Sequence, residues 1–372
     1  MGDAEKMTPS GVEVRGLSKS LGSRQVLCEL DFALEMGKTG AIVGPSGAGK
    51  TTLLNIISGL VVADAGRVAI DGVTVAQSSE GKPRIHVPPS VRNVGYVFQD
   101  YLLFPHMTVF ENVAYGLRAR HSPSSTVMEK VSGALERMGV RELRDKKPSQ
   151  ISGGEMQRVA LARAIVLEPK LLLMDEPLSA LDRSTRETLR LELKRTFDEL
   201  ATTVLYVTHD LDEAFFLGQS LGILHSGRLS FFSSKGDLLG RMGRSTAEFL
   251  GFNLVEGRLL AVNGSGGTLQ IPGWEPVTVP LLNESAGRVG QDVVVAVPPE
   301  SVRIVTQGGA PGVRARINDV WEFKDRVQIV LGDPGKRLVC EVSSLEFRKL
   351  ALNRGDYVKL TLENALLLSQ TA

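Results

Sequence analysis

Hydrophobic positions in the first two thirds of the chain form short runs that alternate with stretches of helical periodicity. Residues 41–43, 171–174 and 203–207 are apolar runs of strand length, and the last two are each followed by a charged stretch. Residues 51–59 place apolar side chains at the spacing of one helix face. This alternation predicts βα units and a largely parallel sheet, and therefore an α/β fold class.

Three further helices are predicted between two of these strands, over residues 108–120, 125–140 and 152–167. Pro148 interrupts the pattern before the third helix. We expect a helical insert that separates two strands of one sheet and forms a helical subdomain over about residues 100–165.

From Leu254 onward the periodicity becomes that of short alternating strands, separated by Gly, Pro and Asn turns. The predicted strands cover residues 255–262, 293–297, 313–320, 326–331, 337–342 and 357–362. We therefore expect a first domain over residues 10–242, a linker over 243–253, and an all-β domain of the small-barrel or sandwich type over 254–372.

The second domain contains a weak internal repeat. Gly290 opens a strand that a Glu300-led strand follows, and Gly355 opens a strand that a Glu363-led strand follows. The order predicts two tandem β units of about 60 residues. The alternative is a chance similarity between two glycine turns that lead into strands.

Length and composition narrow the class of protein. A chain of 372 residues exceeds the usual size of one hydrophobic core, which favours two domains. No apolar run approaches the length of a membrane span, and the polar first ten residues do not resemble a secretory signal. Two cysteines are too few for a disulfide framework. A net charge of +1 argues against a nucleic-acid binder. We therefore expect a cytoplasmic protein.

A phosphate-binding loop follows the first apolar run. The sequence fits G-x-x-x-x-G-K-[ST] between a predicted strand and a predicted helix, where backbone N–H groups can surround phosphate oxygens. Lys50 supplies a charge to the β- and γ-phosphates, and Thr51 a hydroxyl to Mg²⁺. The alternative is a glycine-rich turn without a ligand. The predicted nucleotide-binding residues are Gly44, Pro45, Ser46, Gly47, Ala48, Gly49, Lys50, Thr51 and Thr52.

Two adjacent carboxylates end the apolar run 171–174. Asp175 has the position of a magnesium ligand, and Glu176 that of a general base that polarises the attacking water. The alternative makes Asp175 a turn residue and Glu176 a charge at a helix start.

The segment that begins at Ile151 resembles the signature motif of ATP-binding cassette (ABC) transporter ATPases, and three more segments resemble other motifs of that family in the right order. Gln99 matches the Q-loop glutamine, Asp182 the D-loop aspartate and His209 the switch histidine. The resemblance implies ATP and Mg²⁺ as ligands. It implies catalytic roles for Glu176, His209 and Gln99, with Gln99 also near the metal. The signature residues are Ser152, Gly153, Gly154 and Glu155.

Ser152 is a good helix N-cap, and the glycines after it let backbone amides approach phosphate. In the family this segment completes the nucleotide site of a second copy, so the resemblance implies a head-to-tail homodimer. The sequence departs from the family at two positions. Glu155 replaces the usual glutamine, and Leu21 stands where an aromatic ring faces adenine, so base recognition is expected to be weaker.

The β-rich second domain resembles the transport-associated OB-like (TOBE) domain of the importer branch, and the chain is most similar to molybdate importer ATPases. That branch implies a peripheral position on the cytoplasmic face of the membrane, two permease subunits as partners and, indirectly, an extracytoplasmic solute-binding protein. Iron(III), sulfate and polyamine importers remain alternatives, as does a non-transport ABC-type nucleotide-binding regulator. Residues 101–115, which contain an apolar cluster, match the region that receives a permease helix, although internal packing would also explain them.

Overall fold

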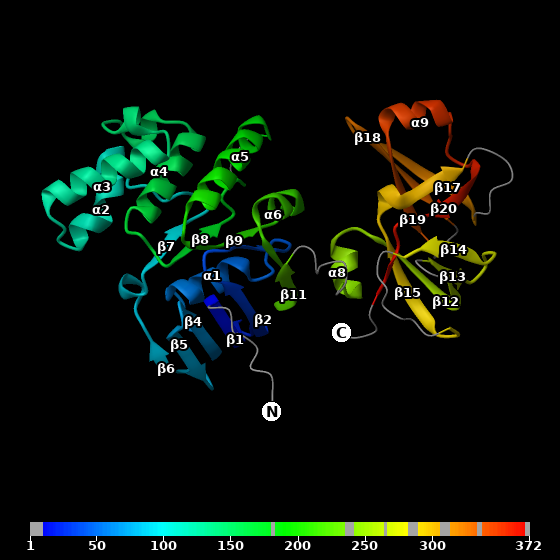
Figure 1. Cartoon of the computed structure of the whole chain (residues 1–372), viewed down its shortest axis with the longest axis horizontal. Helices are drawn as coiled ribbons and strands as arrows, with labels where there is room; N and C mark the ends of the chain where they lie inside the picture. The colour runs from blue at the N-terminus through cyan, green and yellow to red at the C-terminus, as the bar shows by residue number, and fades with distance from the viewer. Residues whose placement is uncertain are drawn as a thin grey trace. The chain divides into compact units, whose positions relative to one another are not determined.

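The computed structural model describes residues 10–179, 183–234, 242–263, 266–281, 289–305, 313–332 and 337–368. The chain divides into two compact units, Met1–Lys235 and Gly236–Ala372 (Figure 1). The predicted D-loop residue Asp182 lies outside the described residues.

The first unit is built on a six-stranded sheet with the order β11-β10-β3-β9-β8-β7. All neighbouring strands are parallel except β10 and β11. Every residue of β3, β8 and β9 is buried, which explains why these strands read as unbroken apolar runs. The prediction of an α/β fold with a largely parallel sheet is confirmed. The strands are β3 (Thr39–Val43), β7 (Val94–Val97), β8 (Leu171–Asp175), β9 (Thr203–Thr208), β10 (Ser220–His225) and β11 (Arg228–Ser234).

A second, antiparallel sheet was not predicted from the sequence. Its order is β2-β1-β4-β5-β6, and its apolar side chains share one core with the parallel sheet and with helix α1 (Lys50–Ser58). The strands β1 and β2 form a hairpin whose last pair is Leu21 with Arg24. The strands are β1 (Ser10–Leu21), β2 (Arg24–Glu35), β4 (Ala65–Ile70), β5 (Val73–Ser79) and β6 (Lys82–His86).

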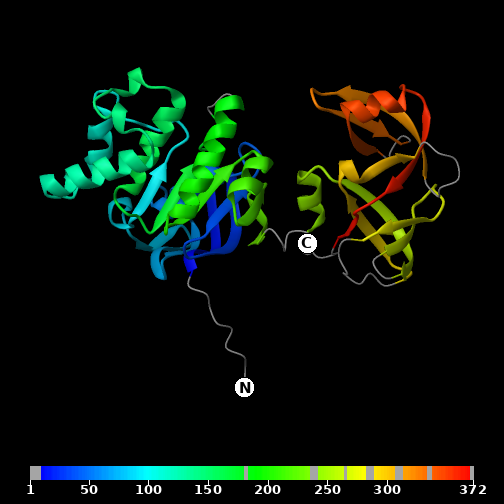
Figure 2. The same ribbon diagram turned by 45° about the horizontal axis from the view of Figure 1, so that its top comes forward.

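The three helices predicted between two strands of one sheet lie between β7 and β8 in the chain. They are α2 (Val109–Ala119), α3 (Ser124–Arg137) and α4 (Gly153–Ile165), and they cluster at one end of the unit in both views (Figures 1 and 2). Thr108 and Glu111 form a capping box that fixes the start of α2. Short 3₁₀ helices connect the elements at Pro89–Val91, Arg141–Leu143 and Pro148–Gln150.

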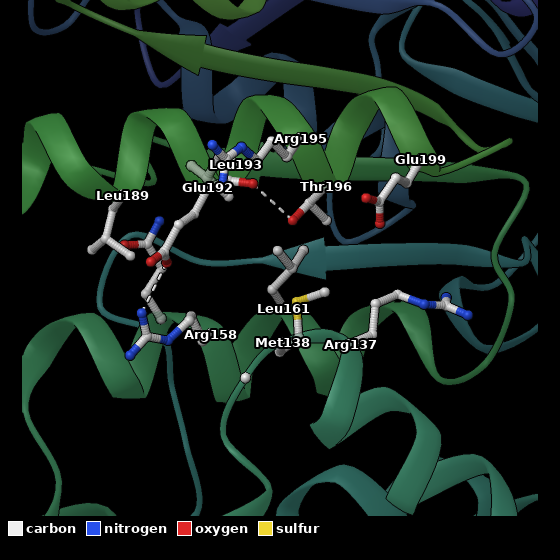
Figure 3. Close-up of a pocket in the computed structure, with 12 residues that line it drawn as sticks. Arg137, Met138, Arg158, Leu161, Leu189, Glu192, Leu193, Arg195, Thr196 and Glu199 are labelled. Carbon is white, nitrogen blue, oxygen red and sulfur yellow. Dashed lines mark hydrogen bonds and ion pairs between the residues drawn. The ribbon is translucent and has the colours of Figure 1, made fainter.

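Helices α5 (Arg183–Glu199) and α6 (Leu211–Leu217) follow β8 and β9. An open cavity of about 320 Å³ separates α5 from α4, with Leu161 and Met138 in its centre (Figure 3). Arg158 bridges the two helices through an ion pair of 2.8 Å with Glu192. Gln157, which also lines the cavity, is only 1% exposed, and neither atom of its amide has a hydrogen-bond partner among the described residues.

The second unit consists of two five-stranded sheets around a single core, with the orders β14-β13-β12-β15-β21 and β16-β20-β17-β18-β19. Its β-rich character is confirmed, and it also contains the short helices α8 (Arg244–Phe249) and α9 (Ser344–Leu350). Helix α8 lies within the predicted linker 243–253. The strands are β12 (Asn253–Asn263), β13 (Gly266–Gln270), β14 (Val277–Pro280), β15 (Asp292–Val297), β16 (Val302–Val305), β17 (Val313–Glu322), β18 (Arg326–Leu331), β19 (Leu338–Ser343), β20 (Tyr357–Leu362) and β21 (Leu366–Leu367).

The strand pairing confirms the internal repeat. Strands β12 to β15 of one sheet correspond in order to β17 to β20 of the other. The last strand of each repeat crosses to the other sheet, so that β16 pairs with β20 and β21 pairs with β15. Each sheet is therefore completed by a strand of the other repeat.

Candidate functional site

The loop between β3 and α1 is shaped for close backbone approach. Gly49 has φ +105°, and a Cβ there would lie 2.7 Å from Leu27 Cδ2 and 2.9 Å from the Val26 carbonyl oxygen. A Cβ on Gly44 would overlap the Leu224 carbonyl oxygen. Among the described residues no side chain caps the start of α1, which leaves its first N–H groups for an anion. Glycine is therefore required at both positions, and the helix start is built to receive phosphate.

Lys50 is held inside this loop. Its side chain is only 5% exposed, and its Nζ donates to the carbonyl oxygens of Gly44 (2.8 Å) and Pro45 (3.2 Å). The same Nζ forms an ion pair of 3.2 Å with Glu176 Oε1. The buried ammonium is thus satisfied by the loop and by the predicted general base.

Glu176 connects Lys50 to His209. While Oε1 faces Lys50, Oε2 lies 2.9 Å from His209 Nδ1. Glu176 has φ +43°, and its N–H donates to the carbonyl oxygen of Val207 at the end of β9. The ends of two neighbouring parallel strands therefore bring the two predicted catalytic side chains together.

Thr51 and Asp175 place oxygen atoms side by side. Thr51 Oγ1 donates to Asp175 Oδ1 at 3.2 Å. Burial raises the pKa of Asp175, and the neighbouring Glu176 carboxylate adds to this rise. No group of three or more His, Cys, Asp or Glu among the described residues could hold a metal. A hydroxyl and one carboxylate fit Mg²⁺, which takes few protein ligands and completes its shell with phosphate and water.

One open pocket of about 440 Å³ collects most of the predicted residues. It also includes Arg24 and Val26, which were not predicted. The pairing of Leu21 with Arg24 across the β1–β2 hairpin brings them to the pocket, and no motif in the sequence signals that pairing. The pocket is lined by Leu21, Arg24, Val26, Ser46, Gly47, Gly49, Lys50, Thr51, Thr52, Gln99 and Glu176.

The signature segment is absent from the residues that line this pocket. Ser152 caps α4, and its Oγ accepts from the Glu155 N–H at 3.3 Å. In return, Glu155 Oε2 accepts from the N–H (2.7 Å) and Oγ (2.8 Å) of Ser152. These hydrogen bonds lower the pKa of Glu155. The carboxylate that departs from the family pattern therefore folds back on its own helix start.

The sequence model of the ABC transporter family matches residues 27–179. The molybdate/tungstate import ATP-binding protein WtpC of Thermococcus kodakarensis is 38% identical over 332 residues, which cover 86% of this chain and 93% of that protein. The chain belongs to the ABC-type import ATP-binding proteins. The sulfate/thiosulfate import ATP-binding protein CysA of Bordetella parapertussis is also 38% identical, over 93% of this ABC protein and 95% of the relative.

Two other comparisons agree with this assignment. The spermidine/putrescine import ATP-binding protein PotA of Rubrobacter xylanophilus is 36% identical over 91% of this chain and 88% of its own length. Among solved structures, cbiO1 of Clostridium perfringens, part of the ABC transporter complex cbiONQ, superposes with a TM-score of 0.55 at 25% identity. That match covers 64% of this chain and 92% of cbiO1. The ATP-binding cassette MJ0796, dimeric and bound to ADP and Pi, gives 0.51 at 29% identity over 60% of this chain and 98% of its own.

In this ABC protein the residues after Gln99 are anchored to the signature helix. Arg163 of α4 donates to the carbonyl oxygens of Tyr101 and Leu102, both at 2.7 Å. Tyr101 and Leu102 have positive φ values of 59° and 43°. Leu102 is 55% exposed, so the predicted apolar cluster lies partly at the surface. Within the part of the chain that the structure describes, no helix is long and apolar enough to cross a membrane.

Proposed function

We propose that this ABC protein hydrolyses ATP to drive a permease that imports molybdate, tungstate or a similar tetrahedral oxyanion. The observation that carries the enzymatic part is the contiguous set Lys50, Glu176 and His209 beside the phosphate loop. For the solute, two of the relatives described above are named for oxyanions. Polyamine import, named for a third relative, and iron(III) import are the alternatives.

In the proposed mechanism the loop N–H groups and Lys50 hold the β- and γ-phosphates. Lys50 then exchanges its contacts with Gly44, Pro45 and Glu176 for phosphate oxygens. This exchange frees one oxygen of Glu176 to accept a proton from the attacking water. His209 holds the other oxygen and orients the carboxylate. Thr51 and Asp175, with Gln99, would hold Mg²⁺, which neutralises phosphate charge when bound.

The second element of the proposal is a homodimer. Ser152 and the glycines after it form a helix start that can bind phosphate, but they do not line the pocket that contains Lys50. A head-to-tail second copy would bring this helix start to the partner's nucleotide and complete both sites.

The remaining partners follow from the same proposal. The partly exposed surface around Leu102 is the contact that we propose for one of two permease subunits, with the chain on the cytoplasmic face of the membrane. A solute-binding protein on the other side would select the anion. The second unit, with its two repeats and shared core, is proposed to be a TOBE domain of OB-like type. No nucleic acid takes part.

Replacement of the proposed base tests the enzymatic role. Glu176→Gln keeps the shape of the side chain, so it should still bind ATP, while hydrolysis should fall by about 100-fold or more, as expected for loss of a general base. The matched variant Lys50→Ala should lose ATP binding itself. Near-normal hydrolysis by Glu176→Gln would remove Glu176 from this role.

The solute is tested separately. The transporter assembled with its permease and binding protein in proteoliposomes should take up labelled molybdate in an ATP-dependent manner. Uptake of sulfate, iron(III) or putrescine in preference to molybdate would reject the proposed solute and leave the ATPase role unaffected.

A further inference from the structure

Three side chains of the β1–β2 hairpin form one face at an end of the nucleotide pocket. Leu21 and Arg24 are paired across the hairpin, and directly paired residues project to the same side of a sheet. Val26, at the β-bulge between Gln25 and Leu27, lines the same pocket. All three line the pocket. The face therefore consists of two aliphatic side chains and one guanidinium group.

The position of this face relative to the phosphate loop is fixed by packing. The carbonyl oxygen of Val26 and the side chain of Leu27 leave no room for a Cβ on Gly49. The next residue, Cys28, donates its N–H to the Gly227 carbonyl oxygen at 2.8 Å. In the proposed ATP site the phosphates would occupy the part of the pocket that contains Lys50 and the loop N–H groups. The base must then lie in the remaining part, against the hairpin.

The guanidinium of Arg24 is available for a ligand. The Arg24 side chain is exposed, and among the residues that the structure describes it has neither an ion pair nor a hydrogen bond. Arg15 of the same hairpin, by contrast, is paired with Glu13 at 2.8 Å. Leu21 and Val26 offer the base only aliphatic contact, which provides no flat surface for a ring. Of the three hairpin residues that line the pocket in the described part of the chain, Arg24 is the one with a planar side-chain group.

We propose that Arg24 stacks its guanidinium plane on the base of the bound nucleotide, with Leu21 and Val26 in contact with the ring edge or the sugar. The proposal rests on the ATP site described above. A guanidinium is planar and weakly hydrated, and it stacks readily on aromatic faces. Stacking contacts the face of a base and does not read its edge, so it is tolerant of base identity. ATP and GTP should therefore bind with similar affinity.

The test compares ligands with and without a base on the full-length chain. Calorimetric titrations with ATP, GTP and inorganic tripolyphosphate are made at one Mg²⁺ and salt concentration for wild type, Arg24→Ala, Arg24→Lys and Arg24→Tyr. Arg24→Ala should lower the affinity for ATP and for GTP by about tenfold, the size of a lost stacking contact. Its affinity for tripolyphosphate should stay that of wild type. Arg24→Tyr should restore nucleotide binding, because it stacks without charge, and Arg24→Lys should not.

If Arg24→Ala weakened the binding of tripolyphosphate as much as that of ATP, Arg24 would lie on the phosphates and the proposal would be wrong. Restored nucleotide binding in Arg24→Lys, or unchanged affinity of Arg24→Ala for every ligand, would also overturn it. Arg84→Ala removes an exposed arginine of the same sheet that does not line the pocket, and it should leave all three affinities unchanged. A wild-type chain that binds neither ATP nor tripolyphosphate would refute the ATP site itself, which is a different outcome.

Discussion

Glu213 is a buried acid of helix α6, and its ionisation should limit the stability of the first unit. It lies in the first turn of α6 and is only 3% exposed, and its Oε1 has no hydrogen-bond partner among the described residues. Burial, together with the nearby Asp210 carboxylate, raises its pKa from 4.5 to about 7, against the opposing effects of a Thr208 hydrogen bond and of Arg190 and Arg186. We predict that Glu213→Gln stabilises the protein at neutral and alkaline pH.

The size and sign follow from the two pKa values. Below pH 4.5 the carboxyl group is protonated in both the folded and the unfolded chain, so it carries no penalty. Between pH 4.5 and about 7 the unfolded chain ionises first, and the free energy of unfolding falls as pH rises. The shift corresponds to about 3–4 kcal/mol at about 1.4 kcal/mol per pH unit, lost progressively up to about one unit above pH 7. Glutamine never ionises and so avoids this loss.

Urea unfolding of both proteins at a series of pH values from 5 to 8 measures the effect. Helical circular dichroism is the suitable signal, because both tryptophans, Trp274 and Trp321, belong to the second unit. The stability difference between Glu213→Gln and wild type should grow with pH and level off above pH 7. The exposed Glu129→Gln serves as the control and should show no such trend. A difference that is independent of pH, or that shrinks as pH rises, would refute the reasoning.

Three further outcomes are expected. Leu21→Tyr should lower the KM for ATP in a steady-state ATPase assay, since it adds an aromatic face to the pocket. An unchanged or higher KM would count against a contact between Leu21 and the adenine base. Gln157→Leu should raise the free energy of unfolding by about 1–2 kcal/mol in urea, because it removes a buried amide without partners; destabilisation would show that the amide is satisfied in solution. Asn253→Ala should destabilise the second unit by about 2–3 kcal/mol in urea unfolding followed by tryptophan fluorescence. The reason is that the Asn253 amide hydrogen-bonds both the Val297 carbonyl and the backbone of Val339. An unchanged unfolding midpoint would show that these hydrogen bonds do not stabilise the unit.

The sequence predicted the parallel sheet and the phosphate site because their signals are local. Strands β3, β8 and β9 are buried throughout and therefore appear as continuous apolar runs. Lys50, Thr51 and Glu176 sit at fixed spacings from such strands. The structure brings them together because parallel strands end at one edge of the sheet.

Other features depend on contacts between distant segments. The antiparallel sheet escaped prediction because four register shifts in the β1–β2 hairpin break the two-residue period that signals a strand. Glu213 lies in a polar stretch that resembles an exposed helix start, and only tertiary packing buries it. Arg24 belongs to no motif, and its place in the pocket follows from the pairing of Leu21 with Arg24.

The reciprocal exchange of β16 and β21 makes the two repeats of the second unit interdependent. A fragment that ends at residue 305 would contain β16 without β20, its partner, and would leave the edge of β15 that β21 covers unpaired. Each half alone would lack a strand partner, so we expect the unit to be either folded or unfolded as a whole in truncation series and in limited proteolysis.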